Sequence, residues 1–324
     1  MKTKKIKIFF IATGLAGSAL MLAACNSGKN QIVAETKSAT AYMNNEEFTC
    51  DTSVITLDSY KLVNTSDDYS VYEIPFKYSD GRMIYGRYYI PKDKDGNIIR
   101  GTDLVIMAHS FGGNYKNLED YAITTVRDKR SVYIFDFIGG SVDSSSSGDM
   151  TQMSLLTEVS DLKLVISKLK RLATIDPKKI FIIGFSQGGA VASIAAKQMP
   201  DDIKGLILIS PAYNIPDNVR EKYKSKAEIP ETPIMLGERL GKIYCTDIYD
   251  MDIWSEIKGY EGPVMIIHGT EDKLVPVSYA KKASEVYDNV AFMEVGGAGH
   301  GYFEGESFAQ VENAIRKYLK LFDK

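Results

Sequence analysis

A serine flanked by glycines stands at the centre of the sequence Gly184-Phe185-Ser186-Gln187-Gly188-Gly189. An apolar run of strand length, Ile180–Ile183, precedes it, and a helical pattern begins near Ala190. A Gly-x-Ser-x-Gly pattern between a strand and a helix forces the serine into strained backbone angles and exposes its oxygen at the end of the sheet. The outer glycines leave room for close approach of the chain. The pattern predicts Ser186 as a nucleophile.

A serine hydroxyl attacks a carbonyl only when a neighbouring base takes its proton. The chain has three histidines, at positions 109, 268 and 300. His109 and His268 each end a strand-like run and are followed by small residues, so we expect them to brace loops by hydrogen bonding. His300 lies in a glycine-rich loop after the last apolar run and can reach across the edge of the sheet. We therefore predict His300 as the base.

The base needs a carboxylate that holds its tautomer and stabilises the imidazolium. Asp272 stands four residues after His268, at the end of the penultimate predicted strand, and is the predicted partner of His300. Glu271 is adjacent to it but should point elsewhere. Asp217, which follows the Gly205–Ile209 strand, is a second alternative.

The elements that must position these residues alternate between strands and helices. Apolar runs of strand length occur at 104–108, 132–137, 180–183, 205–209, 264–267 and 290–295, and several lack polar alternation, which is typical of strands buried on both faces of a mostly parallel sheet. Helical spacing connects them at 153–172, 190–199 and 308–321. Two strands around Ser79-Asp80-Gly81 predict an antiparallel hairpin at the start. The pattern indicates an α/β fold in one domain, residues 51–324.

One interval breaks the alternation. Residues 213–262 separate two predicted strands by about 50 positions, more than a helical crossover needs, and contain the single tryptophan, Trp254, with several tyrosines and methionines. We expect this insertion to form a cap over a pocket, although a surface excursion with a small core of its own has the same pattern.

The order Ser186, Asp272, His300, each at the end of a strand, resembles the α/β-hydrolase superfamily. The segments His109-Ser110-Phe111-Gly112-Gly113 and His268-Gly269-Thr270-Glu271-Asp272, together with the serine motif, resemble bacterial cinnamoyl (feruloyl) esterase-like enzymes. The resemblance runs from about Tyr72 to Leu321. It implies a twisted sheet with helices on both faces and a carboxylic ester as substrate. It also implies an oxyanion hole made by the main-chain N–H groups of Phe111 and Gln187, and a mechanism without metal or cofactor. The alternatives are a peptidase of the same fold, similar to proline- or aminopeptidases, and a non-catalytic lipoprotein that binds a ligand in the pocket.

The first 24 residues have the features of an export signal. Four lysines precede an uncharged stretch of 17 residues, Ile8 to Ala24, and small residues end it. Leu22-Ala23-Ala24-Cys25 resembles the lipobox of bacterial lipoproteins, which implies that Cys25 is lipidated and becomes the new N-terminus. The lipid implied for Cys25 is a diacylglyceryl group, and its two acyl chains suffice for stable membrane anchoring. Residues 25–50 are polar and are predicted to form a tether, so we expect an extracytoplasmic, membrane-anchored protein. The alternative is that the first 24 residues form a short membrane helix.

Composition narrows the classes of function. The chain has 39 basic and 42 acidic residues and a net charge of −3, which gives no basic excess for a nucleic-acid partner. Three cysteines and three histidines are too few for a disulfide scaffold or a typical zinc cluster. Cys50 and Cys245 form either a bridge or two free thiols, and the sequence leaves this, like the oligomeric state, open.

Overall fold

The computed structural model describes residues 53–302 and 304–323. The predicted signal peptide, the tether, the lipidation site at Cys25 and the thiol of Cys50 lie outside these ranges. Within them, no helix has both the length and the apolar character needed to cross a membrane.

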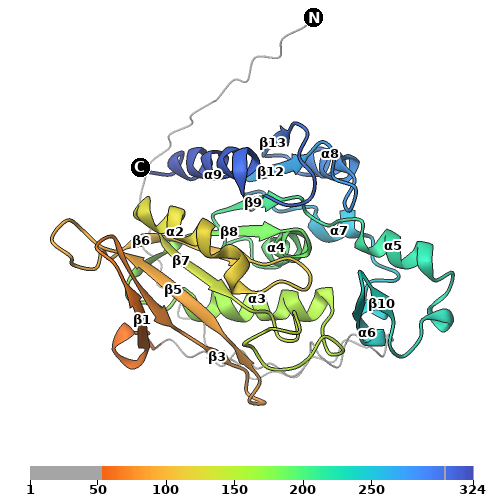
Figure 1. The fold of residues 1–324 in the computed structure, drawn as a ribbon, viewed down its shortest axis with the longest axis horizontal. Coiled ribbons are helices and arrows are strands. Elements are labelled where there is room, and N and C mark those ends of the chain that lie inside the picture. The colour runs from red at the N-terminus through yellow and green to blue at the C-terminus, as the bar shows by residue number, and fades with distance from the viewer. Residues whose placement is uncertain (1–52, 303, 324) are drawn as a thin grey trace, which may run out of the picture. The chain divides into compact units, whose positions relative to one another are not determined.

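A nine-stranded sheet forms the centre of the described residues (Figure 1). Its order is β1 (Lys61–Thr65), β2 (Tyr69–Glu73), β5 (Gly86–Pro91), β7 (Ser131–Phe135), β6 (Thr102–Ala108), β8 (Ile175–Phe185), β9 (Gly205–Ile209), β12 (Val264–Gly269) and β13 (Val290–Val295). The strands from β7 to β13 are all parallel, whereas β1, β2 and β5 pair antiparallel and join them through β7. The predicted α/β architecture is confirmed.

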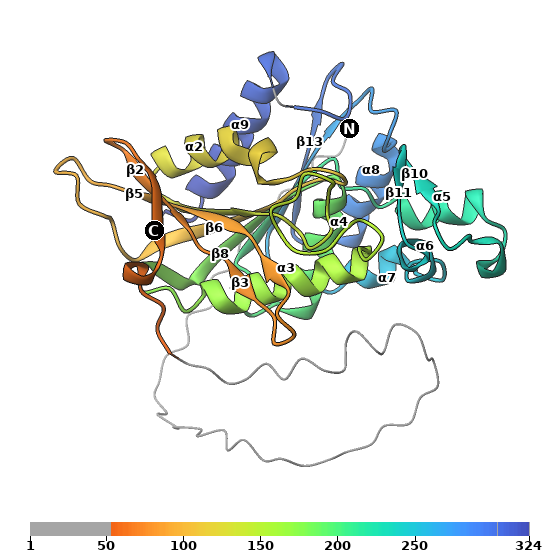
Figure 2. The same ribbon diagram turned by 60° about the horizontal axis from the view of Figure 1, so that its bottom comes forward.

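Helices cover both faces of this sheet (Figures 1 and 2). The first face carries α3 (Leu155–Leu169), α4 (Gln187–Gln198), α7 (Ile253–Ile257) and α8 (Val277–Val286), and the second carries α2 (Glu119–Arg127) and α9 (Gly305–Lys320). Successive strand residues alternate between the two layers: Leu104 and Ile106 pack in the first, Val105 and Met107 in the second. Both faces of the sheet are therefore shielded from water, which explains the unbroken apolar runs of the parallel strands.

The predicted hairpin around Ser79-Asp80-Gly81 is present, but each of its two arms is divided into two strands. Its tip forms a separate two-stranded sheet of β3 (Phe76–Lys77) and β4 (Met83–Ile84), and its base is the β2–β5 pair of the main sheet. Helix α3 begins at Leu155 because the side chain of Ser154 accepts a hydrogen bond from the main-chain N–H of Thr157 in a capping box. Short 3₁₀ turns occur at Leu57–Ser59, Tyr115–Leu118 and Lys226–Glu228.

Residues 213–262 fold into a small group of elements beside α4 (Figure 2). These are α5 (Ile215–Lys222), the hairpin β10 (Ile234–Met235) and β11 (Glu238–Arg239), α6 (Lys242–Thr246), and α7. The hydroxyl of Ser154 donates to Asp247 Oδ2 at 2.7 Å and so ties the end of α6 to the start of α3. Cys245 in α6 is a free, buried thiol.

Candidate active site

Ser186 sits in a sharp turn between β8 and α4, with φ 51° and ψ −115°. Its main-chain N–H donates to Ile209 O at 2.9 Å, and its carbonyl oxygen accepts from Ala212 N at 2.9 Å. The turn closes only because its neighbours are glycines. A Cβ on Gly184 would lie 2.5 Å from Gly188 O, and one on Gly188 would lie 2.4 Å from Ala108 O. The sequence therefore folds Ser186 into a left-handed backbone at the carboxyl end of the central strands.

Three side chains from distant parts of the chain meet at this edge. His300 Nε2 lies 2.9 Å from Ser186 Oγ, and His300 Nδ1 lies 2.7 Å from Asp272 Oδ2. A carboxylate accepts only, so Nδ1 of His300 carries the proton and Nε2 presents a lone pair to the serine hydroxyl. The structure thus brings together the predicted nucleophile, base and carboxylate in one chain of hydrogen bonds.

The carboxyl of Asp272 is fully buried and well satisfied. Its Oδ1 accepts the main-chain N–H groups of Leu274 and Val275, both at 2.9 Å. Burial by itself would raise the pKa of Asp272, but these hydrogen bonds and the one from His300 outweigh it and hold the pKa below its ordinary value. Asp272 is therefore an anion that orients the imidazole.

The other two histidines brace loops, as the sequence indicated. His109 is buried; its Nδ1 donates to Ser110 O at 2.8 Å and its Nε2 accepts Phe137 N–H at 3.0 Å. His268 Nε2 lies 2.8 Å from Val275 O and 3.1 Å from Asp272 Oδ2. Burial lowers the pKa of both rings, which keeps them neutral.

The alternative carboxylates lie elsewhere. Asp217, on α5, accepts from Arg220 Nη2 at 2.6 Å and from the hydroxyl of Tyr279 at 2.7 Å. Glu271 is exposed, and its main-chain N–H donates to Ala298 O at 2.9 Å. Neither carboxylate contacts His300.

The loop that carries His300 is fixed on both sides. Before it, Gly269 packs so closely on the backbone of the loop that a Cβ there would lie 2.3 Å from Ala298 O. After it, buried Tyr302 has its hydroxyl 2.8 Å from Ser210 Oγ, and its carbonyl oxygen accepts the hydroxyl of Tyr121. The imidazole is thereby held in place although glycines surround it.

Two residues whose main-chain N–H groups have no acceptor among the described residues line the pocket over Ser186. These residues are Phe111 and Gln187. Gln187 is the first residue of α4, where a main-chain N–H has no partner in the helix. The two residues that the resemblance implied as oxyanion donors therefore lie at the pocket over Ser186; that their N–H groups bind an oxyanion stays a prediction.

Both polar atoms of the Gln187 side-chain amide are hydrogen-bonded, which the sequence did not reveal. Its Oε1 accepts the hydroxyl of Tyr244, from α6, at 2.7 Å, and its Nε2 donates to Glu158 Oε2, from α3, at 2.8 Å. Glu158 is buried, and burial raises its pKa well above the ordinary value. The insertion is thus connected by hydrogen bonds to the residue that follows the nucleophile.

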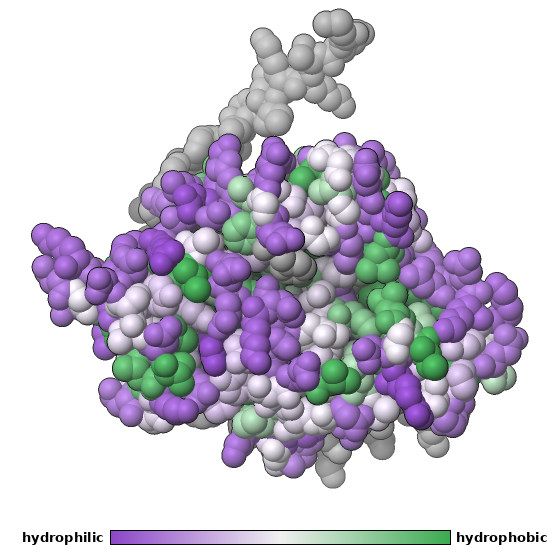
Figure 3. Space-filling model, in the orientation of Figure 1, coloured by the Kyte–Doolittle hydropathy of each residue, from purple (hydrophilic) through white to green (hydrophobic). Residues whose placement is uncertain are grey.

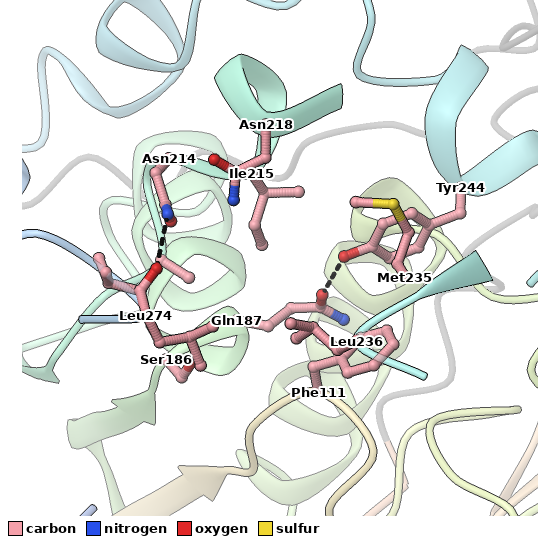
Figure 4. Close-up of a pocket in the computed structure, with 12 residues that line it drawn as sticks. Phe111, Ser186, Gln187, Asn214, Ile215, Asn218, Met235, Leu236, Tyr244 and Leu274 are labelled. Carbon is pink, nitrogen blue, oxygen red and sulfur yellow. Dashed lines mark hydrogen bonds between the residues drawn. The ribbon is translucent and has the colours of Figure 1, made fainter. Parts of the chain in front are cut away.

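A pocket of about 470 Å³, part of it open to solvent, lies over Ser186 (Figure 4). Met235 and Tyr244 of the insertion line one side, and Ser186 and Leu274 line the other. The remaining lining residues are mostly apolar as well: Phe111, Ala212, Ile215, Leu236 and Val275, with the amides Gln187, Asn214 and Asn218. On the surface, hydrophobic side chains gather over the insertion (right of Figure 3). The site suits a substrate with an apolar group next to its reacting carbonyl.

Known proteins share this architecture. A family model described as "Serine aminopeptidase, S33" matches residues 100–244. Est1E from Butyrivibrio proteoclasticus, solved with ferulic acid bound, is 24% identical with a TM-score of 0.64, and the match covers 73% of this chain and 94% of that one. A monoacylglycerol lipase from Paleococcus ferrophilus is 18% identical with a TM-score of 0.56, covering 73% and 98%. These likenesses establish the α/β-hydrolase fold.

Curated relatives match over shorter stretches. The monoglyceride lipase of Rattus norvegicus is 27% identical over 136 residues, which is 41% of this chain and 41% of the lipase. The chain spans 41% to 59% of the length of the curated relatives that it matches. The matched regions lie in proteins named as lipases, esterases or α/β-hydrolase-domain proteins.

Proposed function

We propose that this protein is a serine hydrolase that cleaves carboxylic esters through an acyl-enzyme intermediate. The observation that carries the proposal is the unbroken hydrogen-bond chain from Ser186 Oγ through His300 to Asp272, with links of 2.9 and 2.7 Å. Those are the distances at which a histidine base accepts a serine proton while a carboxylate stabilises the resulting imidazolium.

The reaction follows from the geometry. His300 Nε2 takes the Ser186 proton as Oγ bonds to the ester carbonyl carbon, and the carbonyl π electrons move to oxygen. The main-chain N–H groups of Phe111 and Gln187 stabilise that oxyanion, each donor being worth about 2.7–4 kcal/mol in the transition state. The tetrahedral intermediate then collapses and expels the alkoxide, which receives the proton from His300. Water, activated by the same imidazole, hydrolyses the acyl-enzyme and restores Ser186.

The apolar pocket and the likeness to Est1E with ferulic acid bound support a small acyl or hydroxycinnamoyl (feruloyl-type) ester as substrate. The description of the matched family favours a second candidate, an aminopeptidase of the same fold. An aminopeptidase must bind a substrate ammonium, for which a carboxylate is the natural partner. No acidic side chain is among the described residues that line the pocket, so we favour the ester.

The test uses the full chain with p-nitrophenyl acetate and butyrate, methyl ferulate and an aminoacyl-p-nitroanilide. We expect ester hydrolysis and covalent labelling by a fluorophosphonate probe, and we expect Ser186→Ala to abolish both. Labelling that survives this change would remove Ser186 from its role. Cleavage of the anilide in preference to all three esters would favour the peptidase.

We further propose that Cys25 carries a diacylglyceryl anchor, so that the domain works at an extracytoplasmic membrane surface. The lipobox-like sequence and the polar stretch that follows it support this proposal. Metabolic labelling with an alkyne palmitate analogue should mark the parent chain, and Cys25→Ser should lose both the label and the membrane fraction. A palmitate label that persists in Cys25→Ser would contradict it.

A further inference from the structure

The hairpin β10–β11 ends in a turn whose backbone does not suit its first residue. Met235 pairs with Glu238, so Leu236 and Gly237 alone form the loop, and their φ angles are 50° and 90°. A two-residue turn with both φ angles positive favours Asn-Gly, Asp-Gly or Gly-Gly. A leucine in the left-handed region suffers contact between its Cβ and the backbone, which neither glycine nor asparagine suffers to the same degree.

Burial does not compensate for this strain, because the residue Leu236 is 65% exposed. Among the described residues, the other non-glycine positions with positive φ are Lys129, Ser186 and Ser210. Ser186 is the proposed nucleophile, and Leu236 lines the pocket directly above it. An apolar side chain that is strained and also exposed to water is disfavoured twice, which points to a contact made only when the pocket is occupied.

The position of the pocket indicates which part of the ester it receives. The leaving alcohol takes its proton from His300, so its oxygen must lie beside the imidazole. The described pocket lining includes Ser186, Gln187 and Phe111 but not His300. The acyl group, on the opposite side of the carbonyl, therefore extends into the pocket toward the hairpin.

We propose that Leu236 is a specificity-determining residue that covers an apolar acyl group of the bound ester and so favours acyl groups longer than acetyl. This inference rests on the proposed ester hydrolysis. The hairpin base is held independently of the tip, because Leu240 N donates to Pro233 O at 2.9 Å and Lys222 Nζ donates to Ile234 O. The leucine is therefore presented from a fixed support.

The test compares Leu236→Asn with the parent in the full chain. Asparagine tolerates the left-handed turn, so we expect the melting temperature to rise by about 2–4 °C. We expect the hexanoate-to-acetate ratio of kcat/KM for the p-nitrophenyl esters to fall about tenfold, because the leucine contact with the longer acyl group is lost. Both esters share one leaving group, so the ratio reports the acyl side alone.

Ile234→Asn is the matched control. Ile234 is 53% exposed on the same hairpin but does not line the pocket, and we expect it to leave the hexanoate-to-acetate ratio unchanged. An unchanged ratio in Leu236→Asn, or an equal fall in the control, would overturn the inference while acetate hydrolysis still supports the proposed function. Failure of the parent to hydrolyse either ester would overturn the proposed function itself and this inference with it.

Discussion

Replacement of Asp272 by asparagine tests the hydrogen-bond chain at its least exposed link. The change preserves size and shape, but the two ends of the new amide are not equivalent. The N–H groups of Leu274 and Val275 point at Oδ1 from 2.9 Å, so the amide oxygen must take that position. The amide nitrogen then replaces Oδ2, 2.7 Å from His300 Nδ1.

An amide nitrogen donates a proton and accepts none, so it forces His300 to place its own proton on Nε2. That nitrogen faces Ser186 Oγ at 2.9 Å and could no longer accept the serine proton. We expect kcat to fall about 10⁴-fold, which is about 5.4 kcal/mol of transition-state stabilisation. The fold should tolerate the change, because the two main-chain bonds to the side chain remain.

The assay is steady-state hydrolysis of p-nitrophenyl butyrate, with the melting temperature measured in parallel. Asp217→Asn is the control: it removes a carboxylate that binds Arg220 and Tyr279, and we expect less than a twofold change in kcat. A loss below tenfold in Asp272→Asn would refute the reasoning, as would a larger loss in the Asp217 variant.

Three further predictions concern the surroundings of the site. Gly188→Ala should lower kcat at least 100-fold and destabilise the fold by about 1–3 kcal/mol, because the new Cβ would lie 2.4 Å from Ala108 O and 2.5 Å from His109 O at the end of β6. Gly296→Ala, where a Cβ would have no atom within 4 Å, is the thermal-melting control. Burial raises the pKa of Glu158 well above 4.5, so the stability that its neutral form gives is present below pH 4.5 and is lost as the pH rises through the folded-state value. Glu158→Gln, always neutral, should therefore gain melting temperature over the parent as the pH rises from 4.5 to 9, and a constant difference would contradict this. Burial raises the pKa of Cys245 to about 11, so iodoacetamide at pH 8 should leave it unmodified until urea is added, as peptide mass spectrometry would show.

Local patterns in the sequence were sufficient to predict the parallel strands and the serine turn. Both depend on short-range rules: strands buried on two faces are apolar throughout, and only glycine fits the positions around Ser186. His300 and Asp272 were predicted because parallel strands end at the same edge of the sheet. The structure shows these residues where that rule puts them.

Other features depend on contacts that no local pattern encodes. The strand β1 is mostly exposed, so its residues lack the apolar signal of the interior strands. The hairpin β10–β11 has strands of two residues and a Leu-Gly turn in place of the usual Asn-Gly, which removes both of its sequence signals. The hydrogen bonds of Glu158 and Tyr244 to Gln187 join residues far apart in the sequence, and only the packing of α3, α4 and α6 brings these residues together.

The anchoring of Tyr302 two residues after His300 has a consequence for turnover. Because Ser210 and Tyr121 hold that tyrosine, the loop loses its conformational freedom when the chain folds. An incoming ester then meets an imidazole that is already aligned, and no part of its binding energy is diverted to ordering the base. Loss of the hydrogen bonds that hold Tyr302 would therefore lower the turnover rate without altering a single reacting group.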